Sequence, residues 1–242
     1  MIRLVSFDIF RTLLDIQEDK NNPDAYDLVA RFLGYHGVAV TGKNLSETLA
    51  LETARYLSLS SSEFPDVDIL RVLDEALSGL GHSATPSLIS ESALVLRAAT
   101  TRLTPVKGAF ESVATLVAAG YRVCLCSNTQ RAFTIGELRA FGLLDLFDPI
   151  VFSSDVGACK PDPAVFSRLV ELAGVAPSEV VHIGDNYRED AEGAHRFGLR
   201  TVWLDRDDSG RASPAADRRI TLADLADLPV IVASLNPMDR DN

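Results

Sequence analysis

Cysteine, histidine and long apolar runs are all scarce in this 242-residue chain. Three cysteines are too few and too unevenly placed for a disulfide framework. Cys124 and Cys126 lie in a strand-like apolar run, so we expect them to be core residues. No apolar run approaches the roughly 18 residues that a membrane-spanning helix needs. The first ten residues become acidic too soon for a signal peptide, and we expect a cytoplasmic protein.

Basic side chains are outnumbered, with 23 Lys and Arg against 34 Asp and Glu, which gives a net charge of −11. A negative surface repels phosphate backbones, so no nucleic-acid partner is expected. The same charge repels small anionic substrates, and a phosphate pocket would therefore need cations placed inside it. Hydrophobic residues make up 47% of the chain, an ordinary value for a globular protein with a sizeable core.

Short apolar runs that end at a polar residue or glycine alternate with helical patterns. This alternation is typical of βαβ units, and it predicts an α/β fold with a doubly wound parallel sheet and a Rossmann-like core. The catalytic groups of such a fold gather at the carboxyl ends of the strands. The strands are expected at 2–7, 121–126, 149–152, 180–183 and 201–204, and the helices at 109–119, 132–141, 163–173 and 190–197.

The stretch from about Leu14 to Thr104 has a different pattern. It contains four amphipathic helical segments and no strong strand, which predicts an all-helical insertion after the first strand. We therefore expect a core domain formed by residues 1–13 and 104–242, with a second domain at residues 14–103. The four helical segments are expected at 25–36, 45–57, 67–80 and 87–100.

Two of the expected strands are followed at once by polar residues suited to chemistry. Asp8 ends the first strand, where a fixed carboxylate can act as a nucleophile, and Thr12 lies near enough to orient it. Ser127 and Asn128 follow a later strand, at a place where a hydroxyl and backbone N–H groups can bind an anion. A helix N-cap would explain Ser127 equally well.

Two further segments add a cation and a pair of carboxylates. Lys160 precedes a Pro-Asp-Pro sequence that stiffens the chain, although a surface lysine would fit that segment too. Asp185 and Asp190 bracket a loop that enters a helix, in the sequence GDNYRED. Two carboxylates so close together suit Mg²⁺, while Asp190 could also be an acid that favours the helix dipole.

In this order and spacing, the four segments resemble the four motifs of the haloacid dehalogenase-like superfamily. The resemblance covers residues 2–8 and about 103–206, and the helical insertion lies where members with a helical cap carry it. It implies that Asp8 is the nucleophile and that Thr12 supports it. It also implies that Ser127, Asn128 and Lys160 bind the transferring group.

The resemblance further implies a magnesium cofactor and a small, phosphorylated substrate. Asp8, Asp185 and the main-chain carbonyl of Phe10 would coordinate Mg²⁺. Asp190 would support the site from just outside the metal or pair with Lys160. The family pattern does not choose between a monomer and a homodimer.

Two positions depart from the pattern of the phosphatases in this superfamily. Phe10 stands where a second aspartate usually protonates the leaving group, and Arg11 stands where glycine is usual. The side chain of Arg11 would either reach the substrate or cover the surface. The loss of this general acid is expected to cost about 10² to 10⁴ in rate for leaving groups that need a proton. We therefore expect a Mg²⁺-dependent phosphatase that prefers activated phosphates, whose leaving groups need none.

Two alternatives remain. The aromatic Phe10 also resembles the metal-independent 2-haloacid dehalogenases, whose halide leaves without a proton. Against that reading, Asp185 is retained, Phe166 stands where those enzymes have a tyrosine, and no arginine-bearing segment matches theirs. The second alternative is a catalytically inactive binding protein that has kept the fold.

Overall fold

The computed structural model describes residues 1–19, 22–210, 212–221 and 225–236. Its centre is a six-stranded sheet in the order β5-β4-β1-β6-β7-β8, with every neighbouring pair parallel. The predicted α/β class and parallel sheet are therefore confirmed. The strands are β1 (Leu4–Phe7), β4 (Arg122–Ser127), β5 (Ile150–Phe152), β6 (Val180–Gly184), β7 (Arg200–Leu204) and β8 (Arg218–Ile220).

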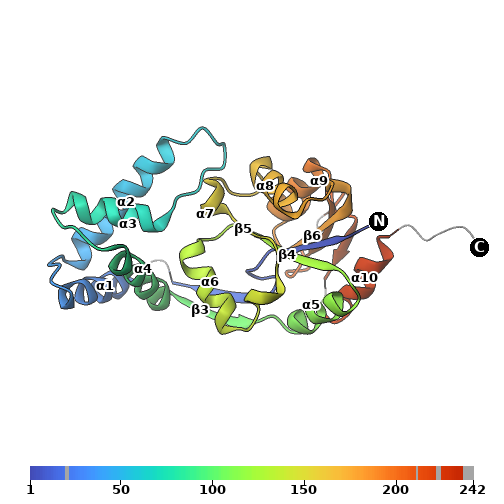
Figure 1. Ribbon diagram of the computed structural model, residues 1–242, viewed down its shortest axis with the longest axis horizontal. Coiled ribbons are helices and arrows are strands. Elements are labelled where there is room, and N and C mark those ends of the chain that lie inside the picture. Colours follow the sequence, from blue (N-terminus) through green and yellow to red (C-terminus); the bar gives the residue numbers. More distant parts are fainter. Residues whose placement is uncertain (20–21, 211, 222–224, 237–242) are drawn as a thin grey trace, which may run out of the picture.

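Helices cover both faces of this sheet (Figure 1). Alternate residues of β1 point to opposite faces, so that Val5 and Phe7 join one buried cluster while Leu4 joins the other. Cys124 and Cys126 are buried beside Leu4, as predicted. The helices on the first face are α5 (Ala109–Ala118), α6 (Arg131–Ala140) and α10 (Leu228–Ser234), and those on the second are α8 (Pro163–Ala173) and α9 (Ala194–Phe197), with the short α7 (Ser153–Val156) following β5.

The inserted stretch forms four helices that lie beside the sheet rather than on it (Figure 1). They surround a hydrophobic cluster of their own, which includes Val29, Leu45, Leu73 and Ile89. Each begins at a residue with a capping side chain, as Thr41 shows by accepting from the N–H of Asn44. The four helices are α1 (Pro23–Tyr35), α2 (Gly42–Ser58), α3 (Ile69–Gly79) and α4 (Pro86–Thr100).

The expectation that this stretch contains no strand is wrong at both of its ends. β2 (Leu14–Glu18) pairs antiparallel with β3 (Thr101–Pro105) and forms a two-stranded ribbon between the sheet and the four helices. Most of the ribbon's residues are exposed or half-buried, so their sequence lacks the apolar alternation that identifies a strand packed on a core.

The last predicted helix of the core also differs. A π-helical segment at Tyr187–Gly193 precedes α9, so the helical winding starts earlier than residue 190 and is wider than an α-helix. β8 and α10 account for the carboxyl-terminal part, whose residues 222–224 and 237–242 lie outside the described residues. Within the described residues, no helix combines the length and apolar character that crossing a membrane requires.

Candidate active site

The carboxyl ends of three neighbouring strands meet at one edge of the sheet. Asp8 follows β1, Ser127 ends β4 on one side of β1, and Asp185 follows β6 on the other side. The Asp8 backbone N–H donates to the carbonyl oxygen of Ile183 at 2.8 Å, which ties the turn after β1 to β6. Segments separated by more than a hundred residues are thereby brought into one site, as the strand-end positions predicted.

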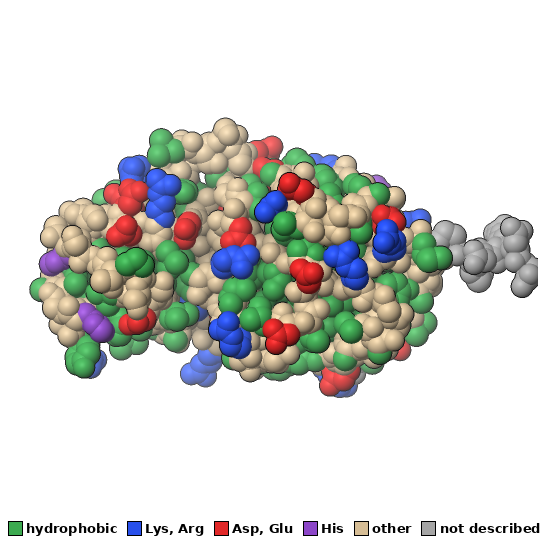
Figure 2. Space-filling model, in the orientation of Figure 1, with side chains coloured by type: hydrophobic (Ala, Val, Ile, Leu, Met, Phe, Trp, Pro, Cys, Tyr) green, Lys and Arg blue, Asp and Glu red, His purple; other side chains and the backbone are tan. Residues whose placement is uncertain are grey.

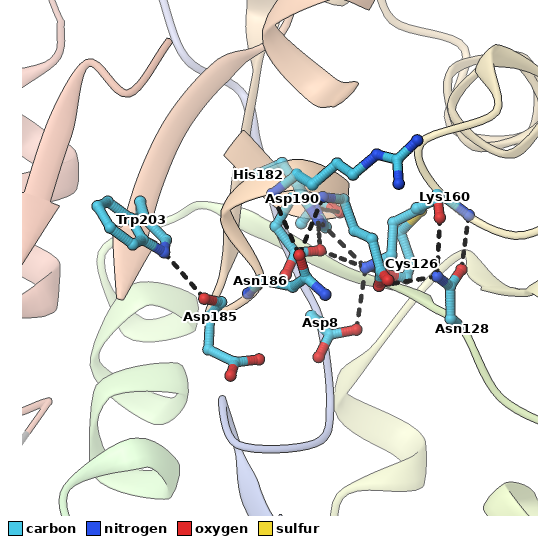
Figure 3. A network of polar contacts seen from close by, with 12 residues as sticks. Asp8, Cys126, Asn128, Lys160, His182, Asp185, Asn186, Asp190 and Trp203 are labelled. Atoms are coloured by element: carbon cyan, nitrogen blue, oxygen red, sulfur yellow. Dashed lines mark hydrogen bonds and ion pairs between the residues drawn. The ribbon is translucent and has the colours of Figure 1, made fainter. Parts of the chain in front are cut away.

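Lys160 lies at the centre of the site, and Figure 3 shows its ammonium group among three oxygen acceptors. Its Nζ donates to Oδ1 of Asp8 at 2.9 Å, to Oδ1 of Asp190 at 2.5 Å and to the carbonyl oxygen of Cys126 at 2.8 Å. The Lys160 side chain is fully buried. All three ammonium hydrogens therefore have acceptors, which a buried lysine requires.

The charges in this network control one another's protonation. Burial by itself would lower the pKa of Lys160, but the negative charges of Asp190 and Asp8 raise it, so the lysine stays charged. Burial would raise the pKa of Asp190, but Lys160 and the contact with His182 lower it. Burial raises the pKa of Asp8, and the lysine only partly offsets this effect. Of the two roles predicted for Asp190, the geometry favours pairing with Lys160.

Close packing positions Asp190. A Cβ on Gly184 would lie only 2.2 Å from Cγ of Asp190, so the glycine that ends β6 leaves the space that the carboxylate occupies. A Cβ on Gly193 would likewise lie only 2.6 Å from Cβ of Pro161. The backbone N–H of Asn186 donates to Oδ2 of Asp190 at 2.9 Å. Both glycines are thus needed for the close approach of these side chains.

His182, in β6, also belongs to this network. Its Nδ1 lies 2.9 Å from Oγ of Ser6, and its Nε2 lies 3.1 Å from Oδ1 of Asp190. Burial and the charge of Lys160 lower the pKa of His182, which favours the neutral ring. The histidine is fully buried and fixes Asp190 from behind, so it is a core residue that also serves the site.

Asn128 holds the lysine segment in place. Its Oδ1 accepts from the backbone N–H of Lys160 at 2.7 Å, and its Nδ2 donates to the Lys160 carbonyl at 3.0 Å and to Glu189 at 2.9 Å. Both amide hydrogens are therefore used within the protein. Substrate binding by Asn128, which stays a prediction, would have to use its backbone N–H.

Glu189 was not among the predicted site residues. It is half-buried beside Asn128, and burial followed by the charge of Asp190 raises its pKa to about 7. Its position directly before Asp190 was the one feature of the sequence that could have indicated a place in the site. The spacing of Asp185 and Asp190 alone gives no reason to select a residue between them.

Two predicted site residues have a hydroxyl group that is buried without a hydrogen-bond partner among the described residues. The atoms are Oγ1 of Thr12 and Oγ of Ser127. A buried hydroxyl usually has a partner, because an unmade hydrogen bond costs free energy. The turn after Asp8 and the end of β4 therefore offer two unused donors at the same edge of the sheet as the Lys160 ammonium.

Asp185 lies on the other side of Asp8 from Lys160 (Figure 3). Its Oδ2 accepts from Nε of Arg11 at 2.7 Å, and the terminal nitrogen of Arg11 donates to Asp207 at 2.9 Å. Burial and the charge of Asp8 raise the pKa of Asp185 to about 6, with Arg11 acting in the opposite direction. Arg11 thus contacts one acid of the site and another at the surface, whereas the sequence analysis considered only contact with substrate or a position covering the surface.

Asp8, Asp185 and Asp190 each place a carboxylate oxygen within 4.8 Å of the others. An all-oxygen set of this kind suits a hard divalent cation such as Mg²⁺. Because Lys160 and His182 already occupy Oδ1 of Asp190, the geometry favours Asp8 and Asp185 as the ligands. The residues present therefore fit the metal that the sequence motifs implied, and the carbonyl of Phe10 stays a predicted ligand.

Phe10 packs beneath an arginine from the inserted helices. The guanidinium of Arg97 lies 5.2 Å from the Phe10 ring and 5.4 Å from the Phe133 ring. It also pairs with Glu18 at 2.8 Å and with Glu137 at 2.7 Å. At the position where phosphatases of the superfamily usually have an aspartate, this chain therefore has a cation–π contact between α4 and the core.

A second contact between the inserted helices and the core lies next to the lysine. In the 59–68 loop, the carbonyl of Phe64 accepts from the backbone N–H of Cys159 at 2.7 Å. The carbonyl of Val67 accepts from the Gln130 amide at 2.8 Å. The loop after α2 is thus hydrogen-bonded to the segment that immediately precedes Lys160.

The sheet and its strand-end charges define a doubly wound α/β protein with a carboxylate–lysine site at the edge where β4, β1 and β6 end. The chain belongs to the haloacid dehalogenase-like hydrolase family, which matches residues 2–198. The predicted family and the coarse activity, that of a hydrolase, are therefore confirmed.

Relatives with different reactions resemble the chain. It is 38% identical over 112 residues to the haloacid dehalogenase-like hydrolase domain-containing protein 3 of Danio rerio, and the match covers 46% of each chain. It is 37% identical over 87 residues to a phosphoserine phosphatase of Thermus thermophilus, with 36% of this chain and 35% of the relative covered. The chain thus matches less than half the length of either curated relative.

Among solved structures, a 2-haloacid dehalogenase from Pseudomonas syringae pv. Tomato superimposes with a TM-score of 0.71 at 25% identity. The superposition covers 98% of this chain and 100% of that one. The phosphatase and dehalogenase relatives together leave the particular reaction to be argued from the site.

Proposed function

We propose that the protein is a Mg²⁺-dependent phosphatase that works through a covalent aspartyl intermediate on Asp8. The observation that favours it most is the arrangement around Asp8. Lys160 contacts one oxygen of its carboxylate, and the acid Asp185 lies on the opposite side. The hydroxyls of Thr12 and Ser127 have no hydrogen-bond partner within the part of the chain that the structure describes. Such a site has a fixed positive charge and hydroxyl donors for a phosphoryl group, and acids for a metal ion.

In the first step, a carboxylate oxygen of Asp8 attacks phosphorus and the bond to the leaving group breaks. The two hydroxyls would donate to the phosphoryl oxygens, and the positive charge of Lys160, held beside Asp8, would stabilise the negative charge there during transfer. Mg²⁺, held by Asp8, Asp185 and the carbonyl of Phe10, would supply further positive charge there. In the second step, water attacks phosphorus, which releases phosphate and restores the Asp8 carboxylate.

The leaving group determines how well this site can work. Phe10 has no proton to give, and its ring is packed under Arg97. A leaving group that departs as a stable anion needs no proton, as with acyl and aryl phosphates. We therefore propose a small activated phosphate as the substrate class, with alkyl phosphates slower by about 10² or more.

We also propose that residues 14–103 act as a cap domain over the strand-end site, with residues 1–13 and 104–242 as the core. The separate hydrophobic cluster of α1–α4 and the polar ribbon β2–β3 support this division. The contacts of the 59–68 loop and of Arg97 lie on the side of the core that holds the site. A cap in this place would select the substrate by its shape.

A second candidate function is dehalogenation of a 2-haloacid, which the similarity to the Pseudomonas syringae dehalogenase favours. Asp8 would attack the carbon that bears the halogen, halide would leave without a proton, and water would then attack the Asp8 ester carbon. Against it, Asp185 is retained and the Phe166 ring is packed in the core against His182 and Phe197. Phe166 has no hydroxyl to offer a substrate.

The first test is hydrolysis of acetyl phosphate and of an aryl phosphate, with Mg²⁺ and with a chelator, by the wild-type protein and Asp8→Asn. Turnover that needs both the metal and Asp8 supports the phosphatase. Metal-independent release of halide from a 2-haloacid, lost in Asp8→Asn, would favour the dehalogenase. No turnover of either class would support the binding-only alternative.

Oxygen-18 water separates the two reactions in one measurement. Hydrolysis of a phosphoaspartate places the heavy oxygen in phosphate, because water attacks phosphorus. Hydrolysis of an aspartyl ester places it in the Asp8 carboxylate, because water attacks carbon. Mass spectrometry of the peptide that contains Asp8 after many turnovers is expected to show no heavy oxygen, and its incorporation would contradict the phosphatase proposal.

A further inference from the structure

Arg11 has an unusual backbone conformation for its residue type. Its φ is +57°, in the left-handed region that a residue with a Cβ rarely adopts. Its backbone N–H donates to the carbonyl of Leu14 at 2.7 Å, and its own carbonyl accepts from Arg206 at 3.0 Å. Both backbone groups are thus held in the turn that follows Asp8, so the start of the Arg11 side chain is fixed beside the site.

The guanidinium lies between two acids. Nε is 2.7 Å from Oδ2 of Asp185, and the terminal nitrogen is 3.1 and 2.9 Å from the two oxygens of Asp207. Asp207 is well exposed, whereas Asp185 belongs to the cluster of three carboxylates around Asp8. Arg11 therefore neutralises an acid of the cluster from the solvent side.

From this geometry we propose that Arg11 competes with a divalent cation for Asp185 and thereby sets how tightly the site binds Mg²⁺. The inference rests on the proposed function for the identity of the ion, but not on the reaction. The negative charge of the three clustered acids is partly neutralised by Lys160 on the buried side and by Arg11 on the solvent side. Removal of Arg11 leaves a more negative cluster and frees an oxygen of Asp185.

Of the two cations beside the cluster, Arg11 can release its acid more readily than Lys160. Lys160 cannot leave the acids it contacts without becoming a buried, unpaired charge. Arg11 is about half exposed and has Asp207 as a second partner, so it can give up Asp185 and keep an ion pair. Arg11 is thus the cation that an incoming metal ion would displace.

The test is Mg²⁺ and Mn²⁺ binding by titration calorimetry at constant ionic strength and without substrate. Arg11→Gly suits the positive φ, and Arg11→Gln keeps a long polar side chain without the charge. Both variants are expected to bind the ions at least about tenfold more tightly, because a unit positive charge a few ångströms from a divalent cation is removed. Asp185→Asn in the Arg11→Gly background should abolish the gain.

Arg131→Gln is the matched control. Arg131 also pairs with an aspartate at 2.7 Å, and its side chain is 47% exposed against 46% for Arg11, but its partner Asp155 is outside the carboxylate cluster. Its variant is expected to change metal affinity by less than about twofold, since distant exposed charges are screened. Unchanged or weaker binding in both Arg11 variants, or no binding by any protein, would overturn the inference. A difference in affinity without turnover would leave it standing and count against the phosphatase alone.

Discussion

The two sides of Asp8 hold their charges in opposite ways. On one side the side chains of Lys160 and Asp190 are 0% and 2% exposed, and every ammonium hydrogen has an acceptor. On the other side Arg11 is 46% exposed and its outer partner Asp207 is 77% exposed. The buried side is complete before any ligand arrives, whereas the exposed side can exchange its cation.

This difference shows which part of the site is fixed by folding and which is adjustable. A buried ion pair with a removed partner leaves an uncompensated charge in a medium of low dielectric constant. An exposed pair is replaced by water at little cost. If the proposed function is right, Asp8 is oriented as the nucleophile from the buried side, and metal binding is regulated from the exposed side.

Lys160→Ala is expected to have the largest effect on stability. It leaves Asp8 and Asp190 facing each other in the core, and the expected loss is about 3 to 5 kcal/mol in the free energy of unfolding. Urea denaturation followed by circular dichroism measures it. Lys43→Ala, which removes a lysine with an exposed partner at 3.9 Å, should change stability by less than about 0.5 kcal/mol. Equal losses in the two variants would refute the contrast.

Ser6→Ala tests the second layer of the buried side. Ser6 and His182 are both fully buried, and the hydroxyl lies 2.9 Å from Nδ1 of the ring. Without it the ring nitrogen has no partner there, and we expect a loss of about 1 to 3 kcal/mol. Ser58→Ala, at an exposed serine, is the control and should be nearly neutral. A neutral Ser6→Ala would show that the ring nitrogen does not depend on this contact.

Substitutions at Arg11 test the exposed side through the backbone. Because φ is +57°, Arg11→Gly should be more stable than Arg11→Ala by about 1 kcal/mol. The same pair of substitutions at Arg168, within α8, should show the reverse order by about 1 kcal/mol, since glycine is unfavourable in a helix. Thermal unfolding of the four variants makes the comparison. The same order at both positions would contradict the backbone geometry.

Asp207→Asn is expected to have the smallest effect, within about 0.5 kcal/mol of the wild-type free energy of unfolding, because its ion pair with Arg11 is exposed. Urea denaturation at low and at moderate salt measures it. A loss comparable to that of Ser6→Ala would show that the two sides of the site are more alike than their burial indicates.

The sequence was sufficient to predict the parallel sheet and five of its strands with the residues at their ends, but not the edge strand β8. Asp8, Ser127 and Asp185 each follow a run of apolar residues, and a buried parallel strand needs such a run. The ribbon β2–β3 was not predicted, because backbone pairing joins residues about 85 positions apart in the sequence. The ribbon also buries little apolar surface. Nothing local distinguishes it from a loop.

The missing parts of the site are contacts between distant side chains. Pairing of Arg11 with Asp207, and of His182 with Ser6, joins segments more than 170 residues apart. Which acid a long arginine side chain reaches depends on the backbone conformation at its own residue and on the neighbouring loops. A motif gives the residue types at the strand ends, whereas these partners follow only from the folded geometry.

The most direct test of the central claim is to trap the nucleophile. The wild-type protein would be mixed with acetyl phosphate and Mg²⁺, quenched in acid within one turnover, digested and analysed by mass spectrometry. We expect a phosphoryl group on the peptide that contains Asp8, located at Asp8 by fragmentation and missing from Asp8→Asn. Phosphate released with no modified peptide, or a phosphoryl group on another residue, would contradict Asp8 as the nucleophile.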